Sequence, residues 1–284
     1  MANPWPTPQQ RVQARIDELP VFPAVAVRVL GVLKQADHDV CDVARCVELD
    51  PALAVRVLAL ANSALFSPKR PIRTIAHATL YIGERALFGA VLAAAAERFF
   101  HAKPLPTTAN EATLWEHSLA VSSIARKLAQ RVGLDGDRAM ALGILHDVGL
   151  LYLRTETQAL QEEIEAARSA GLSRREAELA TFGADHALLG GALLAAFGLP
   201  EDLANGVTTH HEVVEDAPAS EEDCVHLADK IAAAAGLLPD EEVPPEEASP
   251  LLLSRLAVDV ITLEELVKEA PADLAAMQQQ LGVA

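Results

Sequence analysis

The chain has 284 residues, enough for one large domain or two smaller ones, and 51% of them are hydrophobic while only 4% are aromatic. A core built mainly from Ala, Leu and Val favours close-packed helices, because Ala and Leu are strong helix formers. The net charge of −17 is concentrated in residues 104–284, which carry 31 acidic and 11 basic side chains. Residues 1–103 carry 9 acidic and 12 basic side chains. Because an acidic surface repels a phosphate backbone, we predict no nucleic-acid partner.

Helix signals recur along residues 1–103. Thr7-Pro8 and Asp50-Pro51 each place a capping side chain before a proline, which is typical of the first turn of a helix. The segments expected to be helical begin at Pro8, near Pro23 and at Pro51, the last running to Asn62, and two more lie between Arg73 and Phe100 with a break near Gly83. We find no alternating pattern of useful length that would indicate a strand.

The second half follows Lys103–Asn110, which we interpret as a linker. Capping boxes or stop signals mark most of its helices. The first expected helix runs from Asn110 to Gly133 and carries His117, and the second begins at about Asp137 and continues through His146 and Asp147. Further helices are expected to begin at Ser173, to run from about His186 to Gly198, and to run from Pro200 to His210-His211. The last two begin at Ser220, with Asp229 in the helix, and at Thr262. Pro239–Pro250 is rich in Glu and Pro, which indicates a linker or loop.

The compartment is predicted from what the sequence lacks. Cys41, Cys46 and Cys224 form no disulfide or zinc pattern, and the N-terminus shows no signal-peptide pattern. The longest apolar run, Gly89–Ala96, is too short to span a bilayer. We therefore predict a cytoplasmic protein without a membrane partner.

The most informative pair is His146-Asp147, in the apolar run Leu142–Leu150 that we expect to be helical. A buried carboxylate is costly unless it is hydrogen-bonded, paired or bound to a metal. Imidazole and carboxylate ligands together suit Zn, Mn, Fe or Mg. The candidate ligands for one or two such ions are His117, His146, Asp147, His186, His210, His211 and Asp229. We expect His117, His146, Asp147 and Asp229 to converge in one cluster.

The order of these residues resembles the HD phosphohydrolase superfamily, and most closely its HD-GYP branch. Further motifs make the chain look like the HDOD family over roughly residues 12–235: Leu19–Pro23, Asp50–Leu58 with Asn62-Ser63, Ile72–Ile75 leading to Leu80–Gly83, and Phe197–Pro200 before the double histidine. In that family an N-terminal helical subdomain packs on a degenerate HD-type subdomain. The resemblance implies an all-α fold with two packed subdomains, over residues 1–103 and 111–238, and residues 239–284 as an acidic, Pro-rich linker with a C-terminal helix.

Two departures from the HD-GYP hydrolases concern catalysis. Those enzymes have a lysine three residues after the motif aspartate, where this chain has Leu150, and a Gly-Tyr-Pro segment that is missing after His211. Lys127, Lys230 or Arg126 could in principle supply the missing charge. We assign no catalytic residue.

Each candidate ligand also has a structural interpretation. His117, His146, Asp147 and Asp229 form either a metal core or a hydrogen-bonded relic that fixes helix packing. The ligand interpretation is weaker for His186, His210 and His211, because the double histidine sits at a helix C-terminus, where a histidinium interacts well with the dipole. His226 could share a helix face with Asp229, but the family pattern does not require it.

The HDOD family is generally regarded as regulatory, and its members occur in bacterial signalling. We therefore expect a regulatory module without turnover that acts through a signalling protein partner or a ligand. The alternatives are a metal-dependent phosphohydrolase or phosphodiesterase acting on a nucleotide or cyclic dinucleotide, and a sensor that binds such a ligand or a metal without cleavage. In the hydrolase, bound ions would lower the pKa of a water that attacks phosphorus.

Overall fold

The computed structural model describes residues 6–19, 21–33, 35, 37–62, 66–101, 111–238 and 248–281. Within these residues the chain forms fifteen helices and no strand, which confirms the all-α prediction. The first five are α1 (Pro8–Arg15), α2 (Ala24–Leu33), α3 (Val40–Glu48), α4 (Pro51–Ala61) and α5 (Ile75–Phe100). The others are α6 (Glu111–Arg131), α7 (Gly136–Leu145), α8 (Val148–Leu153), α9 (Gln158–Ser169), α10 (Arg174–Phe182), α11 (His186–Ala196), α12 (Glu201–Thr209), α13 (Glu221–Ala234), α14 (Pro250–Arg255) and α15 (Val260–Leu281).

The predicted helix starts rest on side chains that cap the backbone. Thr7, Asp50, Ser173 and Ser220 each accept a hydrogen bond from a backbone N–H in the first turn of the helix that follows. All except Asp50 complete a reciprocal capping box. These four starts are therefore confirmed, and their cause is local.

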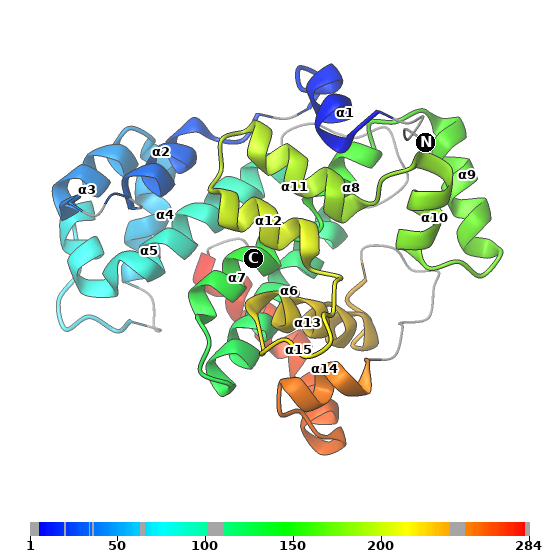
Figure 1. Cartoon of the computed structure of the whole chain (residues 1–284). Helices are drawn as coiled ribbons and strands as arrows, with labels where there is room; N and C mark the ends of the chain where they lie inside the picture. The colour runs from blue at the N-terminus through cyan, green and yellow to red at the C-terminus, as the bar shows by residue number, and fades with distance from the viewer. Residues whose placement is uncertain are drawn as a thin grey trace.

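Helices α2 to α5 pack together at one end of the molecule (Figure 1). Helix α5 is kinked at Gly83, whose φ of 81° lies in the left-handed region that glycine adopts without strain. The parts of α5 before and after the kink are bent by 108°, which confirms the expected break. The second part is rich in buried alanines, and α5 as a whole packs against α2, α3, α4 and α7.

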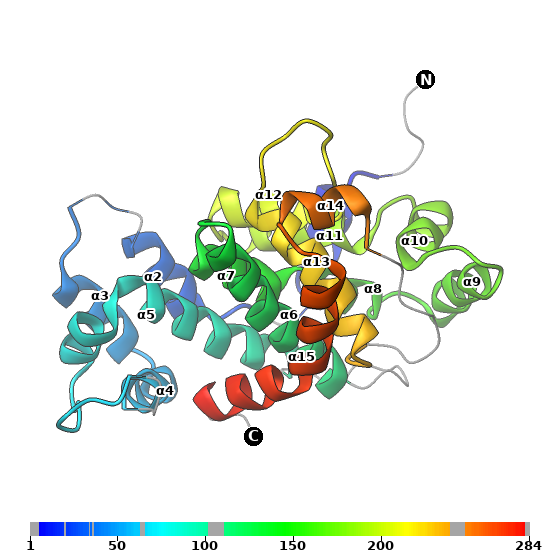
Figure 2. The same ribbon diagram turned by 90° about the horizontal axis from the view of Figure 1, so that it is seen from below.

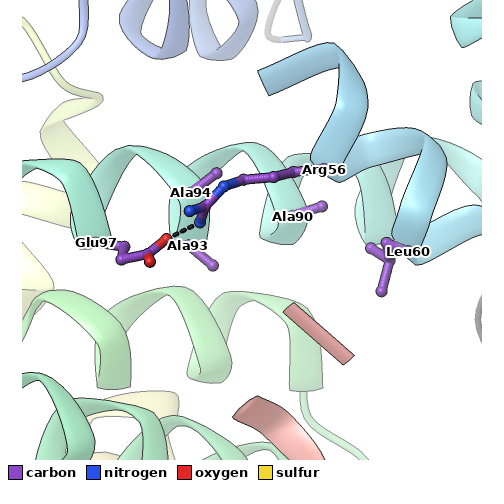
Figure 3. A pocket seen from close by; sticks show the side chains of 6 residues that line it. All are labelled: Arg56, Leu60, Ala90, Ala93, Ala94 and Glu97. Atoms are coloured by element: carbon purple, nitrogen blue, oxygen red, sulfur yellow. Dashed lines mark ion pairs between the residues drawn. The ribbon is translucent and has the colours of Figure 1, made fainter. Parts of the chain in front are cut away.

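Two ion pairs join α4 to α5. Asp50, the N-cap of α4, pairs with Arg98. Arg56 pairs with Glu97 across a small hollow between the helices (Figure 3). The other residues that line this hollow are Leu60, Ala90, Ala93 and Ala94. Both charged side chains that line it are paired with each other, so we interpret the hollow as a packing seam.

Helix α1 packs against α11, in the second half of the sequence (Figure 1). The Tyr152 hydroxyl donates a hydrogen bond to the backbone carbonyl of Arg11 at 3.0 Å, and Arg15 donates to the carbonyl of Thr155 at 2.8 Å. The Arg11 guanidinium also lies 3.9 Å from the centre of the Phe182 ring. The start of the chain is thus anchored on helices that come much later in the sequence.

Helix α6 is central to the second half, where it packs against α7, α13 and α15, while α11 packs against α8 and α12 (Figure 2). Two glycines permit close approach. A Cβ atom on Gly143 of α7 would lie 2.6 Å from Cα of Ser122 on α6, and one on Gly149 of α8 would lie 2.7 Å from the backbone nitrogen of Gly190 on α11. These contacts bring the end of α7 to α6 and the start of α8 to the start of α11.

The prediction that His146 and Asp147 lie inside a helix is wrong. Helix α7 ends at Leu145, and the two residues form the turn before α8. Both helices are buried along nearly their whole length, so the apolar pattern continues through the turn without a break. The terminal helix also begins earlier than Thr262, because the Asp259 carboxylate accepts a hydrogen bond from the Thr262 N–H at 2.8 Å and caps it from there.

The predicted linkers fall mostly outside the described residues. Lys103–Asn110 lies entirely outside them, and of Pro239–Pro250 only the last three residues are described, Pro250 being the first residue of α14. The subdomain boundaries therefore stay predictions. Helix α15 packs against α6 and α13 and also against α4 and α5, so it contacts helices from both halves of the sequence.

No single helix in the described part of the chain is both long and apolar enough to cross a membrane. Two bent pairs reach that length and apolarity only when taken together: Ile75–Glu84 with Ala86–Phe100, and Arg174–Phe182 with His186–Ala196.

Candidate metal centre

The seven candidate ligands come from five places in the fold. Helix α6 supplies His117 and α13 supplies Asp229, while the turn between α7 and α8 supplies His146 and Asp147. His186 is the first residue of α11, and His210 and His211 directly follow α12. Five of the seven are buried; His211 and Asp229 are partly exposed. Most of these side chains sit at helix ends, where the chain turns toward a shared centre.

The first group consists of His117, His146, Asp147 and Asp229. His117 Nε2 lies 3.1 Å from Asp229 Oδ1 and 3.7 Å from Asp147 Oδ2. His146 Nε2 lies 3.3 Å from the same Asp147 oxygen, and the two imidazole rings are 5.3 Å apart. The expected convergence of these four side chains is confirmed.

The second group consists of His186, His210 and His211. His186 Nε2 lies 2.8 Å from His211 Nε2, and the rings of His210 and His211 are 3.9 Å apart. Asp147 connects the groups, because its Oδ1 lies 3.4 Å from His186 Nε2 while its Oδ2 faces the first group. Within each of two triplets, His117–His146–Asp147 and His186–His210–His211, the ligand atoms lie within 4.8 Å of one another.

Backbone carbonyls orient three of the imidazoles. The Nδ1 atoms of His117, His146 and His210 lie 2.6, 2.9 and 2.6 Å from the carbonyls of Leu237, Gly143 and Val207 respectively. A carbonyl only accepts hydrogen bonds, so Nδ1 carries the proton and a neutral ring has its lone pair on Nε2. These three Nε2 atoms are buried and make no hydrogen bond within the described residues. This is the arrangement of a metal-ligating histidine.

Glu178, which is not among the residues predicted from the sequence, orients the fourth imidazole. Its Oε2 accepts hydrogen bonds from His186 Nδ1 at 2.7 Å and from the His186 backbone N–H at 2.8 Å. The side chain is fully buried in α10. No sequence signal distinguished Glu178 from the many acidic residues of this half, since it stands eight positions before the histidine that it binds.

Both carboxylates of the cluster are held ionised. Burial, the largest influence, opposes their charge, yet His146, followed by His186 and His117, keeps the pKa of Asp147 well below its usual value. Burial opposes the charge of Asp229 as well, but the facing His117 side chain lowers its pKa to about 2. Both groups therefore present anionic oxygens at neutral pH.

The histidines of the second group differ in protonation. Burial lowers the pKa of His186, but the attraction of Glu178 outweighs it and raises that pKa to about 9. Burial, with the nearby His146 and His186, lowers the pKa of His210 to about 3, and burial beside His210 lowers that of His211 well below normal. His186 must therefore lose a proton before it can bind an ion.

The donor set fits divalent metal ions. Five imidazoles and two carboxylates lie in two adjoining groups that Asp147 connects. Neutral nitrogen with anionic oxygen suits Zn, Mn, Fe or Mg. His117 Nε2 faces a carboxylate oxygen at 3.1 Å. With its proton on Nδ1, these are two acceptors in contact, and only a cation or a second proton between them makes the contact favourable. One or two ions would satisfy such contacts.

Two of the residues considered as replacements for the missing lysine are engaged elsewhere. Lys127 Nζ lies 2.6 Å from Asp273 Oδ2 on α15, and Arg126 pairs with Asp137 at 2.9 Å. Lys230 follows Asp229 on α13. Leu150, at the position of the missing lysine, is 3% exposed and packs in the core.

Comparison with known proteins assigns the family. Residues 19–213 match the model of the HDOD domain. The chain belongs to the HDOD family. An uncharacterized protein of Treponema pallidum is 26% identical over 207 residues, which cover 70% of this chain and 39% of that protein. Ribonuclease Y of Fusobacterium nucleatum is 30% identical over 99 residues, 35% of this chain and 14% of that enzyme. The chain thus spans well under half the length of these relatives.

Solved structures match over nearly the full chain. An HDOD domain protein of unknown function from Geobacter sulfurreducens is 25% identical, with a TM-score of 0.73 and coverage of 96% of this chain and 97% of that one. A candidate phosphohydrolase from Shewanella amazonensis is 27% identical, with a TM-score of 0.70 and coverage of 96% and 98%. The arrangement of helices is therefore that of HDOD proteins.

Proposed function

We propose that this chain is a bacterial signal-transduction protein whose second half holds one or two divalent ions of Fe, Mn, Zn or Mg. It acts by binding a signalling protein or a nucleotide-type ligand, and it has no turnover of its own. The observation that best supports this proposal is the convergence of two ligand groups: His117, His146, Asp147 and Asp229 lie beside the second histidine group, and Asp147 connects them. A relic needed only for packing has no reason to leave the Nε2 atoms of His117, His146 and His210 buried and without a hydrogen bond among the described residues.

The chain's own residues hold the centre in place. In this proposal His117, His146 and Asp229 ligate on one side, His186, His210 and His211 on the other, and Asp147 is shared. A bound divalent ion supplies a Lewis acid and lowers the pKa of a bound water. The backbone carbonyls behind three of the histidines keep each Nε2 lone pair directed inward.

The absence of turnover is inferred from position 150. Phosphodiester cleavage needs a positioned ion, an in-line water and a group that stabilises charge on the phosphate. Leu150 neither carries charge nor donates a hydrogen bond, and it is buried. The ligand set is thus better preserved than the groups that would stabilise a transition state.

A metal-dependent phosphohydrolase is the second candidate. The position of Asp147 favours it, since one carboxylate facing both ligand groups is suited to a two-metal centre. The likeness to the Shewanella protein agrees with it. A nucleotide or a cyclic dinucleotide would then be the substrate.

The two candidates differ in turnover. We expect no hydrolysis of cyclic-di-GMP when the protein is incubated with Mn or Fe and the linear product is followed. Turnover of roughly 1 per second or faster that vanishes in Asp147→Ala would overturn the regulatory proposal and leave the phosphohydrolase. A His101→Asn variant serves as a control, because His101 is exposed and lies outside the cluster.

A further inference from the structure

The two ligand groups differ in what stands behind their histidines. In the first group, neutral carbonyls orient His117 and His146. In the second group, a carbonyl orients His210, but the carboxylate of Glu178 orients His186. A carboxylate behind an imidazole fixes the tautomer and also raises the basicity of the ligating nitrogen, which a neutral carbonyl does more weakly.

The fold brings Glu178 to His186 through a tight turn. Helix α10 ends at Phe182, and its C-cap Gly183 has a left-handed φ of 76°. Asp185 caps α11 by accepting a hydrogen bond from the Leu188 N–H at 2.8 Å. The axes of the two helices are bent by 72° relative to each other, and Glu178 of α10 contacts the first residue of α11. There, Oε2 of Glu178 accepts from both the backbone and the side chain of His186.

The second oxygen of Glu178 faces a cation. Its Oε1 lies 3.7 Å from Arg174 Nη1, one helical turn earlier. The positive charge of Arg174 is also within electrostatic reach of Asp147. A charged series therefore runs from Arg174 through Glu178 to His186. Glu178 is completely buried, so solvent screens little of its interaction with His186.

We infer that Glu178 is a positioning residue that sets the metal affinity of the His186–His210–His211 group without setting that of the other group. The inference rests on the proposed metal centre. Its physical basis is that the two hydrogen bonds fix both the place and the tautomer of His186, while the first group has its own carbonyl supports. The two halves of the centre are thus inequivalent and can be occupied separately.

The test is a Co²⁺ titration of the full chain, followed by calorimetry and by visible absorption. Wild-type protein is expected to bind two ions. In Glu178→Gln one binding event is expected to weaken by about 10- to 100-fold, with loss of part of the Co²⁺ spectrum, while the other event keeps its affinity. Glu165→Gln is the matched control, since Glu165 also pairs with an arginine in this region but is 51% exposed. It is expected to behave as wild type.

A purely structural role for Glu178 predicts a different result. If Glu178→Gln lowers the melting temperature in chelator but binds both ions as wild type does, the inference is overturned. Should Glu178→Gln fail to fold, Glu178→Asp replaces it: a retained but withdrawn carboxylate should weaken the same event, and unchanged affinities for both ions would again overturn the inference. If wild-type protein binds no Co²⁺ at all, the proposed metal centre itself fails.

Discussion

Asp147 and its neighbours show how burial and charge act on single residues. The carboxylate is 6% exposed, yet His146, His186 and His117 keep it ionised. Such a buried charge is stable only when the imidazoles around it are protonated or a cation lies among them. The same imidazoles stand close enough to repel one another once protonated, so their protonation states cannot be independent.

The raised pKa of His186 predicts a pH dependence in chelator. Its pKa in the folded protein is about 9, against 6.5 for an unperturbed histidine. A raised pKa contributes stability that is fully present below about 6.5 and is lost as pH rises through 9. We expect chelated protein to lose on the order of 3 kcal/mol of unfolding free energy over this range. The pKa of His117 is also raised, because its interaction with Asp229 outweighs burial, so it adds a loss of the same sign, whereas His210 and His211, whose pKa values are lowered, stay neutral in the folded protein.

Denaturant unfolding in chelator at several pH values measures this dependence. His186→Asn should reduce the slope between pH 6.5 and 9, and the part that remains is assigned to His117. If the unfolding free energy of wild-type protein and of His186→Asn depends on pH equally, His186 does not have a raised pKa in the folded protein.

The three cysteines should react unequally with a thiol reagent. Cys224 is fully buried, and burial with the neighbouring Glu221 and Asp223 raises its pKa to about 12. Cys46 is also buried, whereas Cys41 is exposed. Because only the thiolate reacts, we expect one fast thiol in native protein, at Cys41, and three after unfolding. Peptide mapping identifies the labelled residue, and fast labelling of Cys224 would contradict the packing of α13.

At the scale of helices, close approach positions the ligands. Gly149 lets α8 lie against the first turn of α11, where His186 is located. We expect Gly149→Ala to destabilise the fold by about 1–3 kcal/mol through overpacking and to weaken metal binding by displacing α11. Gly31→Ala is the control, since a Cβ there has no neighbour within 4 Å in α2 and the change should stabilise slightly.

Chemical denaturation of both glycine variants gives the comparison. Equal stabilities for Gly149→Ala and Gly31→Ala would show that α8 and α11 do not approach as closely as described.

Local signals explain why much of this fold could be predicted from sequence. Capping residues such as Thr7 and Ser173, and the left-handed Gly83, act within a few residues and leave a readable pattern. The turn at His146-Asp147 leaves none, because buried helices flank it on both sides. Glu178 could not be found for another reason: its role depends on a tertiary contact between α10 and α11.

At the scale of the whole molecule, the first and last helices, α1 and α15, pack against helices that lie far from them in the sequence. Helix α1 packs against α11, and α15 packs against α4, α5, α6 and α13 (Figures 1 and 2). Lys127 on α6 binds Asp273 on α15. His117 also lies 2.6 Å from the carbonyl of Leu237, just beyond α13. Contacts between helices that are distant in the second half of the sequence therefore hold the candidate metal centre in place.

Metal analysis of the purified protein tests the central claim most directly. After incubation with Fe, Mn or Zn and removal of free ions, wild-type protein and His101→Asn are expected to retain one or two ions per chain, while Asp147→Asn retains almost none, because it loses the charge that both ligand groups share. Wild-type protein that holds no more metal than Asp147→Asn under all these conditions would contradict the metal centre and leave the cluster as a hydrogen-bonded packing element.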